Sequence, residues 1–150
     1  MKIDLLHLKQ EQDHTCVPAC IRIVLRCLGH DFSEPDIGVA CKTTSLGTEL
    51  DDAVQGVSSM GFKAIKLKDA TFDDIIRFVE SHHPLIVFLS VNQLPYGGQA
   101  GMHAVVVNGF EKNDVSFVDP ERGEEIVLTL GTFLKAWQAR RCLGLVIEPL

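Results

Sequence analysis

The segment from Gln10 to Gly29, QEQDHTCVPACIRIVLRCLG, joins a polar stretch to an almost wholly apolar helical pattern. Proline has no N–H group and is tolerated only in the first turn of a helix, so Pro18 fixes where this helix begins. Thr15 is a suitable N-cap, which places Cys16 in the first turn, and the final glycine is a suitable C-cap. The sequence therefore predicts a core helix over 16–28 with a thiol at its N-terminal end.

The position of Cys16 allows two interpretations. A thiol at a helix N-terminus experiences the positive end of the helix dipole, which favours the thiolate and hence nucleophilic chemistry. Free cysteine is also among the most buried residue types, so Cys16 could equally be a packing residue. We assign the remaining cysteines to packing, and they are Cys20, Cys27, Cys41 and Cys142.

Length and composition predict a single domain that spans residues 1–150. The formal charge of −6, without a basic cluster, argues against a nucleic-acid surface. No apolar run approaches the roughly 18 residues of a membrane helix, and the N-terminal residues do not resemble a signal peptide. The odd number of cysteines, without framework spacing, predicts free thiols and a cytoplasmic protein.

Helical patterns fill the first half of the chain and short apolar strands fill the second. This segregation predicts an α+β fold, with an N-terminal helical half packed on a C-terminal antiparallel sheet. A glycine-rich loop over 92–101 interrupts the strands and could form a mobile lip of a cleft. The expected helices cover 16–28, 33–41, 47–61, 71–81 and 132–140, and the expected strands cover 62–68, 85–91, 103–110, 115–118, 125–130 and 143–147.

Two polar residues on neighbouring predicted strands complement the thiol. His103 opens a strand and Asp119 closes the next one, so we expect their side chains to meet across a hairpin. A nucleophilic thiol needs a base to take its proton, and the base needs an acceptor that fixes its orientation. Gln10 precedes Cys16 in a loop, where its amide would suit a developing oxyanion. The pattern favours a cysteine peptidase.

Each of these residues also has a structural interpretation. His103 could be a hydrogen-bonded histidine at a strand end, and Asp119 before Pro120 is a common turn starter. A zinc site built from Cys16, Cys20 and the adjacent histidines at 82–83 is less favoured, because no paired Cys-x-x-Cys knuckles occur. No phosphate-binding loop is present, so we expect neither a nucleotide nor a metal cofactor.

The order of these residues resembles a known family, the bacteriocin-processing cysteine peptidases. The resemblance extends from about Leu8 to Leu145 and rests on Gln10, the sequence CVPAC at 16–20, the sequence GMHAVVV at 101–107 and the sequence VDP at 118–120. It implies a papain-like fold, no metal, and cleavage of leader peptides after a Gly-Gly pair. It further implies that Cys16 is the nucleophile, His103 the general base, Asp119 its orienting partner and Gln10 the oxyanion donor.

Two positions beside the nucleophile depart from that family, which usually has an acidic residue before it and a glycine after it. Here these positions hold Thr15 and Val17. The resemblance is to a domain found at the N-terminus of ABC transporters. We expect a free-standing member with a peptide or protein substrate, for which a transporter or a maturation enzyme would be a partner. Val17 keeps open a catalytically silent peptide-binding module, and an acyltransferase of the same fold is a third interpretation.

Overall fold

The computed structural model describes residues 1–97 and 101–150, and the expected loop over 92–101 therefore falls partly outside the described residues. The helices in these ranges are α1 (Cys16–Cys27), α2 (Glu34–Ala40), α3 (Leu50–Ser59), α4 (Phe72–Glu80) and α5 (Leu130–Gln138), with a 3-10 turn η1 (Val91–Gln93). The strands are β1 (Phe62–Leu67), β2 (Leu85–Ser90), β3 (Met102–Glu111), β4 (Asp114–Asp119), β5 (Glu124–Thr129) and β6 (Gly144–Pro149). None of the helices in the described ranges has the length and apolar character needed to cross a membrane.

The strands form one sheet in the order β1-β6-β2-β3-β4-β5, and every neighbouring pair is antiparallel. Strands β3, β4 and β5 follow one another as hairpins, as the turn residues between them predict. Strand β1 comes from the helical half of the sequence but pairs with β6 near the other end of the chain. The predicted α+β class with an antiparallel sheet is confirmed.

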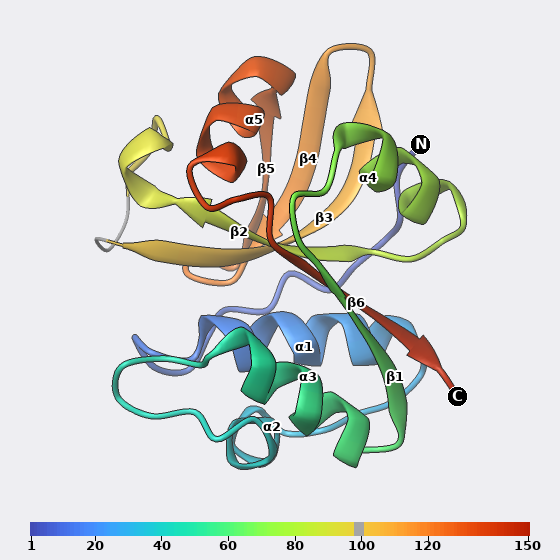
Figure 1. Ribbon diagram of the computed structural model, residues 1–150, viewed down its shortest axis with the longest axis vertical. Coiled ribbons are helices and arrows are strands. Elements are labelled where there is room, and N and C mark those ends of the chain that lie inside the picture. The colour runs from blue at the N-terminus through green and yellow to red at the C-terminus, as the bar shows by residue number, and fades with distance from the viewer. Residues whose placement is uncertain (98–100) are drawn as a thin grey trace.

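Helices cover both faces of this sheet. Figure 1 shows α1, α2 and α3 on one side and α4 and α5 on the other. Side chains of β2 alternate between the two layers: Ile86 and Phe88 join the apolar cluster of α1, whereas Leu85 and Val87 join that of α4 and α5. This alternation explains why β2 is buried along its whole length and reads as a continuous apolar run.

Helix α1 begins at the predicted residue, but its first turn is not capped as expected. Thr15 occupies the N-cap position, yet within the described residues its side chain forms no capping hydrogen bond. An N-cap oxygen binds the N–H of the second or third helical residue, and the third residue here is Pro18, which has none. The Thr15 hydroxyl instead lies 2.8 Å from the carboxylate of Glu34 and 2.9 Å from the carbonyl oxygen of Gln12, and both oxygens are acceptors for its proton. Gly29, with φ +90°, ends the helix as predicted.

Helix α2 lies close against α3 because α3 carries a glycine at the contact. A Cβ atom at Gly56 would lie 2.6 Å from the Cys41 sulfur and 2.7 Å from the carbonyl oxygen of Ala40. Both partners belong to the end of α2, so no larger residue fits at this position without separating the helices. This contact sets the position of α2 and of the side chains at its start.

Helix α5 starts earlier than the sequence analysis expected. The prediction placed its start at Thr132, whereas Thr129 is the N-cap and its hydroxyl accepts a hydrogen bond from the Thr132 backbone N–H. Thr129 and Thr132 are both suitable N-caps. The residue at which β5 ends determines which of them caps α5.

Candidate active site

The structure brings Cys16 and His103 together. Cys16 is the first residue of α1 and is partly exposed, whereas His103 lies near the start of β3 and is only 5% exposed. Cys16 and His103 line the same cleft, the Cys16 side chain is near enough to raise the pKa of the imidazole, and Nε2 is hydrogen-bonded to a carboxylate oxygen of Asp119. Because Nε2 is bound to Asp119, Nδ1 is the nitrogen left to exchange a proton with a thiol, and it lies 3.7 Å from a carboxylate oxygen of Glu121.

Asp119, at the end of β4, is 1% exposed and has polar contacts on both oxygens. Oδ1 accepts from His103 and from the backbone N–H of Glu121 at 2.9 Å, and Oδ2 accepts from the Tyr96 hydroxyl at 2.8 Å. The Arg122 guanidinium lies over the Tyr96 ring, 5.2 Å from its centroid. These contacts fix the carboxylate and, through it, the plane of the imidazole.

The pairing of β3 with β4 explains how His103 and Asp119 meet. The register pairs Val106 with Val118, so Asp119 stands diagonal to His103 across the ladder. Diagonal neighbours in an antiparallel pair lie within reach of long side chains. The hairpin therefore delivers an imidazole and a carboxylate to the end of the sheet at which α1 begins.

The surroundings of His103 favour its charged form. Burial lowers the pKa of the imidazole, but the hydrogen bonds to Asp119 and Cys16, together with their negative charges, outweigh burial and raise the pKa from 6.5 to about 10. Burial raises the pKa of Asp119, and the bonds from His103 and Tyr96 outweigh it and hold the pKa below its usual 3.8. The surroundings thus favour an imidazolium that is bound to the Asp119 carboxylate.

Gln10 lies beside the same cleft as Cys16 and His103. Its amide nitrogen donates to the carbonyl oxygens of Gln12 at 2.8 Å and Asp13 at 3.2 Å. The amide oxygen is buried, and no partner for it occurs in the part of the chain that the structure describes. Gln10 therefore closes the loop in front of α1 in this structure, and its role as an oxyanion donor stays a prediction.

A cleft of about 940 Å³ opens over Cys16 and His103. The loop between α2 and α3 forms one wall, and the start of β3 and Glu121 form another. Leu46 on that loop is 97% exposed and Met102 on β3 is 41% exposed, so both walls offer apolar side chains. The cleft is large enough for an extended peptide segment and ends at the thiol.

The other four cysteines differ from Cys16 in their surroundings. Burial raises the pKa of Cys20 strongly, raises that of Cys41 to about 11, and raises those of Cys27 and Cys142. All five cysteines are free of disulfides. Cys16 is thus distinguished from the rest by its place beside His103 in the cleft.

Sequence reasoning did not identify Tyr96 or Glu34. Tyr96 is the only tyrosine of the chain and lies in the glycine-rich loop before β3, which was the one available signal. Glu34 lies in the first turn of the helix expected over 33–41, a position that gave no sign of burial, and it is only 2% exposed. Within the described residues, no group of three or more His, Cys, Asp or Glu side chains is arranged to hold a metal ion.

Solved structures with the same fold include several peptidase domains. The peptidase domain of Streptococcus ComA, a bi-functional ABC transporter involved in a quorum-sensing pathway, is 22% identical with a TM-score of 0.79, covering 97% of this chain and 98% of that chain. A putative C39-like peptidase from Bacillus anthracis is 13% identical with a TM-score of 0.78, covering 100% and 98%. A double glycine motif protease from an AMS/PCAT transporter, in complex with the leader peptide, is 16% identical with a TM-score of 0.75, covering 99% and 94%.

The comparison with curated proteins found no match. A family model, in contrast, matches residues 2–145, which is nearly the whole chain and includes Cys16, His103 and Asp119. The chain belongs to the Peptidase_C39 like family.

Proposed function

We propose that this protein is a cysteine peptidase in which Cys16 is the nucleophile, His103 the general base and acid, and Asp119 the residue that orients His103. The observation that carries the proposal is that Cys16 and His103 line one cleft and that His103 is hydrogen-bonded to the buried carboxylate of Asp119. Family membership and the fold support a peptidase, and the contacts supply the groups that thiol-dependent hydrolysis requires.

In the first half of the reaction, the Cys16 sulfur attacks the carbonyl carbon of the scissile bond and forms a C–S bond. The His103 imidazolium gives its proton to the leaving nitrogen as the C–N bond breaks, which leaves a thioester and a neutral imidazole. His103 then takes a proton from water, whose oxygen attacks the thioester. The C–S bond breaks, and the thiolate and the imidazolium are both restored.

The negative oxygen formed in each step needs hydrogen-bond donors. The first N–H groups of a helix have no intrahelical partner, so the backbone N–H of Cys16 is available at the start of α1. We assign the second donor to Gln10, whose amide gives up its longer contact, the one to Asp13, when substrate binds. The substitution Gln10→Ala should therefore lower kcat about 10²-fold with little change in KM, as measured with a cleaved peptide. An unchanged kcat would remove Gln10 from the mechanism.

The substrate we propose is a leader peptide or another extended segment with small residues, such as a Gly-Gly pair, before the cut. One structural neighbour is a double glycine motif protease that binds a leader peptide, and two are parts of transporters, which supports a peptide substrate and a partner transporter or maturation enzyme. The free thiols suit a reducing compartment such as the cytoplasm.

Val17, the residue that favoured a silent binding module, is 2% exposed and packs with the core cluster of α1. Its side chain therefore contributes mainly to the core, and nothing in its position separates Cys16 from His103. We keep the acyltransferase as an outcome of the turnover assay, in which an added amine would be incorporated in place of water.

Alkylation tests the proposed nucleophile without knowledge of the substrate. Near neutral pH, iodoacetamide should label Cys16 at least about tenfold faster than any other cysteine, because only Cys16 contacts an imidazolium. The substitution His103→Ala should remove this selectivity. Peptide mass spectrometry over a time course gives the rate at each cysteine.

The matched control for this experiment is His83→Ala, which removes a half-buried histidine that contacts Glu148 far along the sheet. This variant should keep the selectivity for Cys16. Equal labelling of all five cysteines in the unmodified protein would contradict the peptidase proposal.

A further inference from the structure

Glu34 is a buried carboxylate that the proposed mechanism does not use. It is the first residue of α2 and is 2% exposed, whereas Asp36, two residues later on the same helix turn, is exposed. Glutamate is rarely buried to this extent unless hydrogen bonds compensate the loss of hydration. A position in the first turn of a helix does not by itself bury an acidic side chain, because Asp36 lies in the same turn and is exposed.

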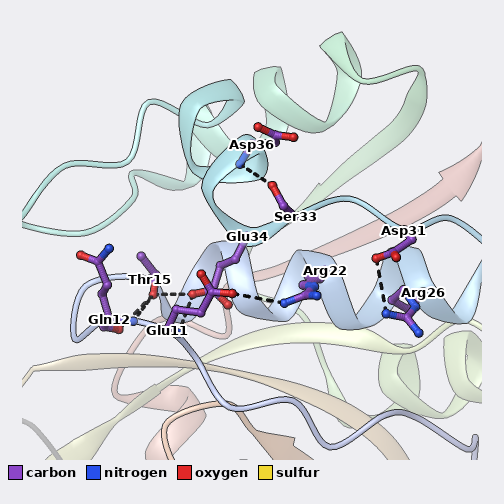
Figure 2. Close-up of polar contacts among 9 residues, drawn as sticks. All are labelled: Glu11, Gln12, Thr15, Arg22, Arg26, Asp31, Ser33, Glu34 and Asp36. Atoms are coloured by element: carbon purple, nitrogen blue, oxygen red, sulfur yellow. Dashed lines mark hydrogen bonds and ion pairs between the residues drawn. The ribbon is translucent and has the colours of Figure 1, made fainter.

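One carboxylate oxygen of Glu34 holds two ends of a single loop. Oε2 accepts from the backbone N–H of Glu11 at 2.7 Å and from the hydroxyl of Thr15 at 2.8 Å. Figure 2 shows the Glu34 side chain reaching from α2 toward this loop, with Glu11, Gln12 and Thr15 around its end. The carboxylate therefore joins α2 to both ends of segment 11–15.

The residues that Glu34 binds are the immediate neighbours of two proposed catalytic groups. Glu11 follows Gln10, and Thr15 precedes Cys16. Within the loop, the Gln12 N–H donates to the Thr15 hydroxyl oxygen at 3.1 Å, so the segment is also closed on itself. A displacement at either end would move Gln10 or Cys16 directly, because each is adjacent in sequence to the residue that Glu34 binds.

The opposite side of the same segment is attached to the strand that carries Asp119. The backbone N–H of Gln10 donates to the carbonyl oxygen of Pro120 at 2.7 Å. The loop in front of α1 is thus held between α2 on one side and the turn after β4 on the other. The contact with Pro120 joins two backbone groups, whereas the attachment to α2 depends on the side chain of Glu34.

We propose that Glu34 is a positioning residue for the nucleophile: its carboxylate holds segment 11–15 so that Gln10 and Cys16 face the same cleft. The inference rests on the proposed function for its turnover readout, but its alkylation readout is independent of any substrate. Thr15 takes part as the group through which Glu34 acts on α1, and its hydroxyl serves this contact in place of a helix cap.

The experiment compares Glu34→Ala and Glu34→Gln with the control Asp36→Asn, which removes an exposed acid from the same helix turn. In Glu34→Ala, we expect the rate constant for alkylation of Cys16 and the kcat for a cleaved peptide to fall about 10- to 100-fold, with KM changed less than threefold. Glu34→Gln keeps a side-chain oxygen acceptor and should retain an intermediate rate. Asp36→Asn should match the unmodified protein in both readouts.

A loss of folding is separated from a loss of positioning by thermal melting of each variant. If Glu34→Ala does not fold, Thr15→Val provides the second test, because it removes the hydroxyl at nearly constant volume and should lower the alkylation rate of Cys16 in the same direction. The inference is overturned if a folded Glu34→Ala or Thr15→Val protein labels Cys16 at the normal rate with a normal kcat.

The two proposals fail in different ways. If the unmodified protein labels Cys16 selectively but hydrolyses no peptide, the peptidase proposal fails, and the alkylation rates of the Glu34 variants still test the positioning role. If the unmodified protein is an active peptidase and the folded Glu34 variants are equally active, the positioning role alone fails.

Discussion

Replacing Cys16 with alanine is expected to reduce hydrolysis of a susceptible peptide by about 10³-fold or more, because no other group can form the acyl intermediate. The free energy of unfolding should change little, since Cys16 is partly exposed at the start of α1 and is not fixed in the core. Initial rates at saturating peptide, together with thermal melting, measure both effects.

The matched control for this substitution is Cys20→Ala, one helical turn further along α1. Cys20 is fully buried and its pKa is raised by burial, so it has no part in the proposed reaction. Removing the sulfur atom of Cys20 should lower the free energy of unfolding by about 1 kcal/mol and leave kcat within about twofold of that of the unmodified protein. If Cys20→Ala abolished turnover while Cys16→Ala did not, the assignment of the nucleophile would be wrong.

The second large effect is expected for Asp119→Asn. The amide keeps the shape of the carboxylate but loses the charge that favours the imidazolium, so kcat should fall about 10²- to 10⁴-fold. The pH profile should change as well. The imidazolium donates the proton to the leaving amine, so activity is lost as pH rises through the pKa of His103, which is about 10 in the unmodified protein. Loss of the Asp119 charge lowers this pKa and moves the alkaline limit of kcat/KM to lower pH.

Two further expectations depend on the raised pKa of His103. Tyr96→Phe removes a single hydrogen bond from the same carboxylate but keeps its charge, so the alkaline limit should move much less than in Asp119→Asn. The protonated imidazole stabilises the folded state, because its pKa is raised on folding; this stabilisation is complete below pH 6.5 and disappears as pH rises toward about 10. An alkaline limit that is unchanged in Asp119→Asn would contradict the ion-pair arrangement.

Features that depend on neighbouring residues could be predicted from the sequence. Pro18 fixed the start of α1 because its missing N–H is tolerated in few positions, and this placed Cys16 at the helix tip. Thr71 was expected to cap α4, and the structure shows a full capping box with Asp74. The hairpin that joins β3 to β4 follows from turn residues between apolar runs.

Features that depend on distant partners could not be predicted in the same way. An apolar pattern shows that a helix is buried on one side, but it does not show which face of which sheet covers it, so the position of α4 and α5 opposite α1 was not foreseen. The burial of Glu34 depends on a loop 19 residues earlier, and the hydroxyl contact of Tyr96 depends on a strand 23 residues later. Single residues in ordinary contexts give no sign of such contacts.

The separation of Cys16 from its two partners along the chain has a consequence for biosynthesis. The thiol-bearing helix leaves the ribosome long before the hairpin that holds His103 and Asp119 is made. Under the proposed mechanism, a nascent chain therefore carries the Cys16 thiol without its base, and it gains the pair of groups only when the sheet has closed.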